Sequence, residues 1–497
     1  MEKKSNMKVQ ISPLKSSLCS ALLLSVASVT VFYQTGHSSS TIDVAKQQSN
    51  KVISVYLLID KPETLEKYVQ DLSRVKKPNF NRVIFSFVKP TLIDYIPGSL
   101  ANTGILGYFD RGDGKGINAF NQLKEAVELS KYKNIQPFLS VGGWNYSCNF
   151  KVMGTNCGAA PTPKNGIHYD WFPDPKDPDK AKQKAAKKSY ANLVKLTSDL
   201  GMQGIDFDYE EFWHADANAK PWGGDPWATQ LAKDILSNGG PTYDVLMEYG
   251  TESGSTFVMP KTIDKVDAIL HEITDNPSSR NLLLATAAPP VGARPITGFV
   301  YGDNATDIYK LGGVWWKGNL KGLWYHLAEK DPKIVNRFDS LGLMTYDLCG
   351  DNPTVCAPYG GGPLNLPGQV LAYMKDYSVW LKAQKTEPAS LTVDQVGKVK
   401  FLPAHYRVKP KVQFGFEVNQ PAYPKNPAGQ LQLTNQLVNQ ITNEQKNSSG
   451  VIIWQMYSEQ NKNVKDSTTT KYTINKSCKV FLQGDNRYDC SADFPGE

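Results

Sequence analysis

The stretch Gly204–Trp213 reads GIDFDYEEFW and carries a carboxylate at every second position, at Asp206, Asp208 and Glu210. Alternation with a period of two predicts a β-strand, because residues i, i+2 and i+4 of a strand face the same side. The three acids would share one face, with about 6–7 Å between successive neighbours. Acids this close cannot all ionise cheaply away from water, so at least one should keep its proton through a raised pKa.

Two interpretations of this acidic strand are open. The commoner one is an edge strand whose acidic face is solvated, with Ile205, Phe207 and Tyr209 packed on the other face. The second is a catalytic site that donates a proton. The position of the strand within the fold decides between them, because only a strand inside the fold would take its acids away from water.

Length and composition describe a folded globular protein. The chain has 497 residues, of which 40% are hydrophobic and 11% aromatic, and this is enough for one large barrel or for two to three ordinary domains. The net charge of +7 is mild for this length. The lysine-rich segment Lys176–Leu200 predicts an amphipathic helix with a solvated lysine face, so nucleic-acid binding is not expected.

The N-terminus predicts export. Four lysines precede the apolar run Leu18–Tyr33, which is shorter than the ~20 residues that span a bilayer. We expect residues 1–40 to be a secretory signal peptide with a linker, and the protein to be extracellular or periplasmic. An uncleaved N-terminal membrane anchor is the alternative, because no clean A-x-A cleavage site follows the apolar run.

The cysteines also favour export. Apart from Cys19, they fall into three sequence-near couples: Cys148 with Cys157, Cys349 with Cys356, and Cys478 with Cys490. Several pairings are open, and three short disulfide loops are the simplest in an oxidising compartment. Zinc would favour C-x-x-C pairs or interleaved histidines, which the sequence lacks. No metal site and no cofactor are expected.

Short apolar segments recur along the chain, each followed by a polar or helical stretch. They are Val52–Asp60, Arg82–Val88, Ile135–Trp144, Met202–Glu210, Asn281–Pro290, Ser340–Asp347, Lys411–Val418 and Gly450–Tyr457. Strands with helix-length connections pair in parallel, and eight such units close as an α/β (β/α)8 TIM barrel with long βα loops. We place the barrel at residues 50–460 and a C-terminal extension with one disulfide at 461–497. Glu210 ends the fourth strand, where barrels carry their active sites, which favours the catalytic interpretation.

Other strand ends carry unusual residues. The third strand ends in the paired glycines Gly142 and Gly143, which would let neighbouring backbones pack tightly. The sixth places Met344 and Tyr346 on one face, and the eighth carries Trp454.

Taken together, these motifs resemble glycoside hydrolase family 18, the chitinases and their relatives. The motifs of that family are D-x-x-D-x-D-x-E, S-x-G-G, M-x-Y-D and a tryptophan on the last strand. Their counterparts here are residues 203–210, Ser140–Gly143, Met344–Asp347 and Trp454, in the order and on the strands typical of the family. Gln203 replaces the usual first aspartate, a position that mainly supports the strand. The resemblance covers roughly residues 50–460 and implies a barrel fold.

The resemblance also implies substrate-assisted hydrolysis with retention. Glu210 would be the general acid and base, while the acetamido oxygen of the sugar attacks the anomeric carbon and forms an oxazolinium intermediate. Asp208 would orient the acetamido group and stabilise the positive charge. Asp206 would share a proton with Asp208, and Tyr346 would donate to the acetamido carbonyl.

Substrate contacts follow from the same resemblance. Asp347 would help to fix the distorted sugar, Met344 would shape the pocket, and Trp454 would be the apolar floor under the reacting sugar. Independently of the resemblance, Trp144 and Trp213 lie on or near predicted loops after the third and fourth strands, and stacking on further sugar rings is one role open to them, because sugar faces are apolar. Packing of these loops onto the barrel is the competing role for both tryptophans.

Several functions share this pattern. The first is a secreted endochitinase that cuts β-1,4 bonds between N-acetylglucosamine units, and the short connection Asn419–Ser449 favours an open cleft. The second is an endo-β-N-acetylglucosaminidase acting on N-linked glycans, and the third is a chitin-binding lectin, which typically lacks the acid. A surface-anchored adhesin is the fourth. We expect a monomer that binds chitin or N-acetylglucosamine oligosaccharides, without nucleic acid and without stable membrane insertion after signal cleavage.

Overall fold

The computed structural model divides into two compact units, Met1–Gln48 and Ser49–Glu497. The first unit lies outside the residues that the structure describes, and the fold is that of the second unit. The described residues are 51–107, 115–143, 146, 172–210, 260–293, 322–346, 366–383, 392–393, 399–400, 410–418, 433–458 and 466–496.

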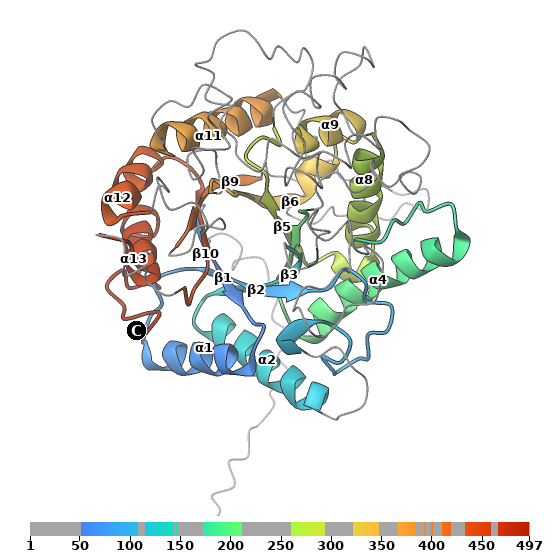
Figure 1. The fold of residues 1–497 in the computed structure, drawn as a ribbon, viewed down its shortest axis with the longest axis horizontal. Helices are drawn as coiled ribbons and strands as arrows, with labels where there is room; N and C mark the ends of the chain where they lie inside the picture. Colours follow the sequence, from blue (N-terminus) through green and yellow to red (C-terminus); the bar gives the residue numbers. More distant parts are fainter. Residues whose placement is uncertain are drawn as a thin grey trace, which may run out of the picture. The chain divides into compact units, whose positions relative to one another are not determined.

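Eight parallel strands close into a barrel, which Figure 1 shows end-on. They are β1 (Val52–Leu58), β2 (Arg82–Val88), β3 (Gln136–Gly142), β4 (Gly204–Asp208), β5 (Leu283–Ala288), β6 (Phe338–Leu343), β9 (Lys411–Glu417) and β10 (Gly450–Trp454). Each overlaps a strand expected from the sequence, so the TIM barrel is confirmed, although β6 ends at Leu343, before Met344 and Tyr346. The order around the barrel is β1-β10-β9-β6-β5-β4-β3-β2. A short antiparallel pair that the sequence did not indicate, β7 (Thr392–Val393) and β8 (Val399–Lys400), precedes β9.

Helices surround the barrel as an outer ring (Figure 1). They are α1 (Pro62–Arg74), α2 (Lys115–Tyr132), α4 (Lys180–Asp199), α8 (Pro260–Thr274), α9 (Leu323–Lys330), α11 (Leu366–Ala383), α12 (Asn435–Glu444) and α13 (Thr470–Phe481). Three 3-10 turns also lie in the connections: η2 (Ile105–Gly107), η4 (Pro277–Ser279) and η7 (Ile334–Arg337).

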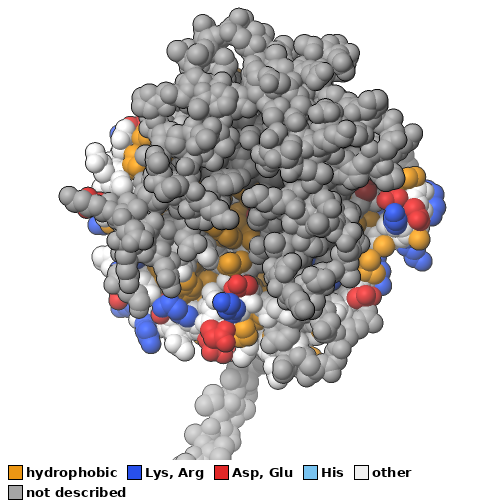
Figure 2. Space-filling view, in the orientation of Figure 1, with side chains coloured by type: hydrophobic (Ala, Val, Ile, Leu, Met, Phe, Trp, Pro, Cys, Tyr) orange, Lys and Arg blue, Asp and Glu red, His pale blue; other side chains and the backbone are white. Residues whose placement is uncertain are grey.

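The lysine-rich helix expected from the sequence is α4. The Asp179 side chain caps it by accepting a hydrogen bond from the backbone N–H of Ala181 (2.8 Å). Tyr190, Leu193 and Val194 are buried against the barrel, while the lysines of this helix are exposed. The predicted solvated lysine face is therefore confirmed. In the view of Figure 2, basic and acidic side chains are interspersed on the coloured surface around the edge of the molecule.

The amino end of the barrel is closed by a buried polar network. The fully buried Arg82 donates to Ser340 Oγ (2.6 Å) and Gln136 Oε1 (3.0 Å), and pairs with Asp339 Oδ2 (2.6 Å). Lys411 pairs with the other Asp339 oxygen at 2.9 Å. Burial raises the pKa of Asp339, but the charges of Arg82 and Lys411 outweigh it and hold the pKa below its ordinary value. These paired charges form a floor beneath the barrel interior.

The segment after β10 packs onto the barrel. Helix α13 lies against α12, β1 and β10, and the Cys478–Cys490 disulfide ties its last turn to the chain that follows. Gly496 N–H donates to Asp71 Oδ2 of α1 at 3.1 Å, and Figure 1 shows the C-terminus beside α1 and α13. One of the three expected disulfides is thus confirmed. The other two, Cys148 with Cys157 and Cys349 with Cys356, lie outside the described residues, and the boundary at residue 460 remains a prediction.

Within the described part of the chain, no helix has the length and apolar character needed to cross a membrane. The apolar run Leu18–Tyr33 lies outside that part.

Candidate active site

The acidic row lies on an interior strand. β4 pairs with β3 on one side and with β5 on the other, so the edge-strand interpretation is wrong. Asp206 and Asp208 are 1% and 3% exposed. The intervening Phe207 packs outward, with its ring 5.0 Å from that of Phe172. The period of two therefore separates an acidic inner face from an aromatic outer face, as the alternation predicts.

Asp206 is held from two sides of the barrel. Tyr56 Oη donates to Asp206 Oδ2 at 3.1 Å, and Ser140 Oγ donates to the same oxygen at 2.7 Å. Because β1 and β4 are not neighbours in the barrel, Tyr56 reaches Asp206 across the interior. Burial raises the pKa of Asp206 to about 6, although the two hydroxyl donors and the charge of Arg82 act in the opposite direction.

The side chains of Asp208 and Glu210 form an acidic pair. Burial, followed by the charges of Glu210 and Asp206, raises the pKa of Asp208 well above its ordinary value. The Asp208 side chain also forms a hydrogen bond with Glu210, and such a bond between two carboxyl groups requires a proton on one of them. Glu210 is half-buried just beyond the end of β4. A proton is therefore kept at the carboxyl end of the barrel, next to a group that solvent reaches.

The paired glycines bring β3 close to this site. Gly143 N–H donates to the backbone carbonyl of Asp208 at 2.8 Å. Both glycines have positive φ angles, +99° at Gly142 and +70° at Gly143. A Cβ at Gly142 would lie 2.3 Å from Asp208 O, and one at Gly143 would lie 2.5 Å from the Phe87 ring. Tight backbone packing by these glycines is thus confirmed, because neither position has room for a side chain.

An aromatic wall adjoins the acids. Trp454, at the end of β10, is half-buried, and its ring stacks on Phe87 (centroids 5.6 Å apart, 26° between planes). Its other neighbour is Tyr56, edge-on at 5.7 Å. The peptide bonds that follow Ser86 and Trp454 are both cis. These contacts fix the indole while leaving part of it exposed, which suits a flat apolar ligand surface.

The other motif residues follow β6. Met344 is buried at 2% exposure, and its N–H donates to Ala288 O at 2.9 Å. Tyr346 is half-buried just after β6 and packs over Gly415 of β9. A Cβ added at Gly415 would lie 3.1 Å from the Tyr346 ring. Burial and the nearby Asp206, Asp208 and Tyr346 raise the pKa of Tyr56 well above its ordinary value. The structure thus brings Tyr346 close to the buried acids.

Three expected contact residues, Trp144, Trp213 and Asp347, lie outside the described residues. Two residues of the site were missed by sequence reasoning, Tyr56 and Phe87. Both lie in apolar strand segments, and their partners come from other strands, so the local sequence carries no signal for either. Ser140 was recognised as part of a motif, but without its role as a donor to Asp206.

The departure from the family motif is local. Gln203 is exposed, and its backbone extends the sheet ladder, donating to Pro137 O and accepting from Leu283 N–H, each at 2.9 Å. Its side chain faces away from the buried acids, as the strand alternation requires for an odd-numbered position.

The fold and the site define a barrel protein with buried carboxyl groups beside an aromatic surface at the carboxyl ends of its strands. The chain belongs to the glycosyl hydrolases family 18, whose family model matches residues 29–487.

Solved structures that match this chain include two chitinases and one inhibitor. The chitinase from Bacteroides thetaiotaomicron is 12% identical, with 88% of this chain and 98% of that chain covered and a TM-score of 0.42. The Ostrinia furnacalis Group IV chitinase in complex with allosamidin is 11% identical, with coverage of 87% and 99% and a TM-score of 0.39. A xylanase and alpha-amylase inhibitor protein from Scadoxus multiflorus is 13% identical, with coverage of 87% and 98% and a TM-score of 0.34.

Proposed function

We propose that this protein is a secreted endochitinase that hydrolyses β-1,4 bonds between N-acetylglucosamine units with retention of configuration. The observation that carries the proposal is the hydrogen bond between the buried Asp208 and Glu210 at the carboxyl end of β4. Family membership supports a glycoside hydrolase. A lectin on the same barrel would have no need of a buried acid pair, whose desolvation costs stability.

In the proposed reaction, Glu210 donates its proton to the glycosidic oxygen as the bond to the anomeric carbon breaks. The acetamido oxygen of the same sugar attacks that carbon and forms the oxazolinium ion. Asp208, now a carboxylate, accepts the acetamido N–H and stabilises the positive charge. Its buried Oδ1 has no hydrogen-bond partner among the described residues, so an acceptor is available for the substrate. Glu210 then removes a proton from the water that opens the ring.

The neighbouring residues would position the sugar. Tyr346 would donate to the acetamido carbonyl and hold it beneath the anomeric carbon, while Trp454 would stack on the sugar face. Met344 would shape the pocket behind them. Asp206, with its pKa of about 6, would exchange a proton with Asp208 as the charge on the reacting sugar changes. The contact assigned to Asp347 remains a prediction from the family resemblance, and those assigned to Trp144 and Trp213 remain predictions from their places in the sequence.

The decisive experiment compares wild type with Glu210→Gln on chitin oligosaccharides and on a high-mannose glycopeptide, with products identified by mass. We expect wild type to cut the oligosaccharides internally and the variant to be about 10²–10⁴-fold slower while still binding them. The first-formed anomer, read by NMR, should be the β form. Cleavage of the glycopeptide alone would point to the endo-β-N-acetylglucosaminidase. Binding without cleavage would point to the lectin.

Secretion is part of the proposal. The Cys478–Cys490 disulfide supports an oxidising compartment, where such bonds persist. Mass spectrometry of the exported protein would locate its N-terminus. A terminus beyond residue 33 would support signal cleavage, whereas an intact N-terminus in the membrane fraction would favour the anchored adhesin. We also propose that the protein acts as a monomer, which its elution volume would test.

A further inference from the structure

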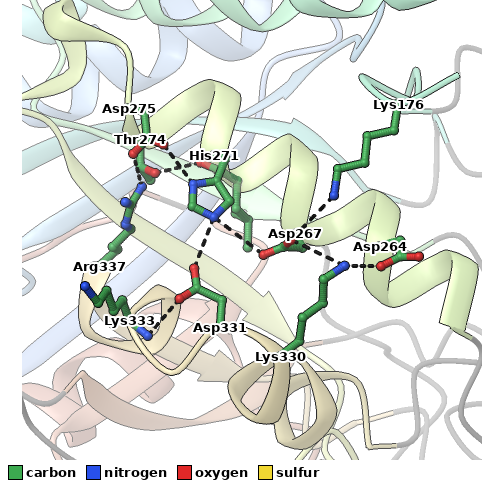
Figure 3. A network of polar contacts seen from close by, with 11 residues as sticks. Lys176, Asp264, Asp267, His271, Thr274, Asp275, Lys330, Asp331, Lys333 and Arg337 are labelled. Carbon is green, nitrogen blue, oxygen red and sulfur yellow. Dashed lines mark hydrogen bonds and ion pairs between the residues drawn. The ribbon is translucent and has the colours of Figure 1, made fainter.

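A cluster of side chains that could hold a metal ion lies outside the barrel, between α8 and the segment after α9 (Figure 3). Asp267 and His271 are one turn apart on α8, and Asp331 follows the end of α9. Helices of a (β/α)8 barrel run opposite to the strands, so the carboxyl ends of α8 and α9 lie at the amino end of the barrel. The cluster therefore lies at the end opposite Glu210.

The three side chains converge on one point. One ligand atom from each lies within 4.8 Å of the other two. His271 Nε2 is 3.1 Å from Asp331 Oδ2 and 3.6 Å from Asp267 Oδ1. A tetrahedral zinc with ligands at about 2.1 Å separates its ligand atoms by roughly 3.4 Å. Both of these separations lie close to that edge length, and the ligand atoms of Asp267 and Asp331 lie within 4.8 Å of each other, so side-chain adjustment would place a metal ion between the three atoms.

The histidine is oriented from behind. His271 Nδ1 lies 2.8 Å from Asp275 Oδ2, and Arg337 Nη1 holds the other oxygen of Asp275 at 2.5 Å. A carboxylate only accepts hydrogen bonds, so Asp275 favours a proton on Nδ1, and Nε2 faces the two aspartates. A carboxylate behind a histidine is the usual support of a metal-binding imidazole.

The aspartate oxygens that face the histidine lack hydrogen bonds. Asp267 is 6% exposed. Among the described residues, no group forms a hydrogen bond with Oδ1 of Asp267 or with Oδ2 of Asp331. The lysines of the network face the other oxygen of Asp267, with Lys330 Nζ at 3.4 Å and Lys176 Nζ at 3.8 Å from Oδ2. One oxygen of Asp267 thus faces the two lysines, while the other faces Nε2 of His271.

We propose that Asp267, His271 and Asp331 bind a divalent transition metal ion of the zinc type. An imidazole with two carboxylates suits zinc rather than calcium or magnesium, which prefer six or more oxygen ligands. The side chain of His271 is 41% exposed, which leaves a path for the ion and room for water as a fourth ligand. The ion would join α8 to the segment that leads into β6, and would brace the barrel independently of the proposed hydrolysis.

The test uses full-length protein without a histidine tag, freed of metal by a chelator and dialysed. Titration with Zn²⁺ against a chromophoric chelator should give one site, and Zn²⁺ should raise the melting temperature. Co²⁺ should give the intense visible absorption of a four-coordinate ion. His271→Ala should abolish all three signals. Asp275→Asn should lower the Zn²⁺ affinity by about 10–100-fold, because it weakens the support of the imidazole without removing a ligand.

Asp264→Asn is the matched control. Asp264 lies on the same helix and pairs with Lys330, but it does not reach His271, so its removal lowers the local negative charge without removing a ligand. Zn²⁺ binding by this variant should match that of wild type. Asp331→Asn, in a partly exposed connection, replaces His271→Ala if the latter fails to fold. Wild type that binds no Zn²⁺, binds Ca²⁺ in its place, or keeps its affinity in both ligand variants would overturn the proposal.

Discussion

Asp206 and Asp208 occupy successive inward positions of β4, yet their surroundings act on the two carboxyl groups in different ways. Burial raises the pKa of both. At Asp206, hydrogen bonds from Ser140 and Tyr56 oppose the rise, whereas at Asp208 the neighbouring acids add to it. One strand thus carries two acids with different proton affinities. Such a difference in surroundings lets one carboxyl group keep a proton while its neighbour carries a charge.

We expect Asp206→Asn to increase the free energy of unfolding at about pH 7. The pKa of Asp206 is about 6 in the folded protein against 3.8 ordinarily, so between these values the folded state holds a proton that the unfolded state releases. The free energy of unfolding therefore falls as pH rises through this window, by about 3 kcal/mol in all. Asparagine keeps an acceptor for the two hydroxyl donors but cannot ionise.

Urea unfolding at about pH 4 and about pH 7 measures this effect. The stability difference between variant and wild type should be large at the higher pH and should shrink at the lower one. Asp60→Asn, at an exposed position, is the control and should show no such pH dependence. A difference between Asp206→Asn and wild type that is the same at both pH values would contradict the assignment.

At the scale of elements, the strands could be predicted because each is a short apolar run bounded by polar residues. Helix α4 was equally plain, since its buried residues recur with helical spacing and Asp179 marks its start. The acids of β4 could be predicted because their alternation with apolar residues is visible within one short stretch of sequence. Tyr56 and Phe87 were not, because closure of the barrel brings them to Asp206 and Trp454 from other strands. Contacts of that kind have no local signature.

The glycine pair after β3 shows how an element end shapes the site. We expect Gly143→Ala to lower the free energy of unfolding by about 2–5 kcal/mol. About 1–2 kcal/mol comes from placing a Cβ at positive φ, and about 1–3 kcal/mol from crowding the Phe87 ring. Because Phe87 supports Trp454, substrate affinity should fall as well. Urea unfolding and oligosaccharide titration measure the two effects.

Gly98→Ala separates these two contributions. Gly98 has a φ of +77°, close to the +70° of Gly143, but a Cβ there would meet nothing within 4 Å. It should therefore lose only the backbone part, about 1–2 kcal/mol, with no change in substrate affinity. Equal losses of stability in the two variants would show that contact with Phe87 has no energetic role.

At the scale of the whole molecule, the two ends of the barrel have different tasks. The carboxyl end carries the acids and the aromatic wall, while the amino end carries the Arg82 network and the cluster around His271. TIM barrels generally divide chemistry and stability in this way. The two proposals therefore concern separate ends of one fold, and a variant at one end should leave the properties of the other unchanged.

The C-terminal segment stabilises the barrel through its packing. We expect Phe494→Ala to lower the free energy of unfolding of the whole barrel by about 3–5 kcal/mol, the usual cost of emptying a buried phenylalanine site. Phe494 is fully buried and stacks on Phe80 with ring centroids 5.3 Å apart. Its ring also meets Tyr68 of α1 edge-on at 6.1 Å, so the loss reaches the first helix of the ring.

A single cooperative urea transition, shifted to lower concentration, would show that residues 466–496 fold as one unit with the barrel. Leu371→Ala is the control, because that leucine is 53% exposed on α11 and its truncation should cost little. If residues 461–497 are instead a separable extension, Phe494→Ala will unfold the tail alone. The main transition will then stay in place, and the domain will end near residue 460 as the sequence predicts. Hydrolysis should be unaffected in either case under conditions where the barrel is folded, because Phe494 contacts none of the acids of β4.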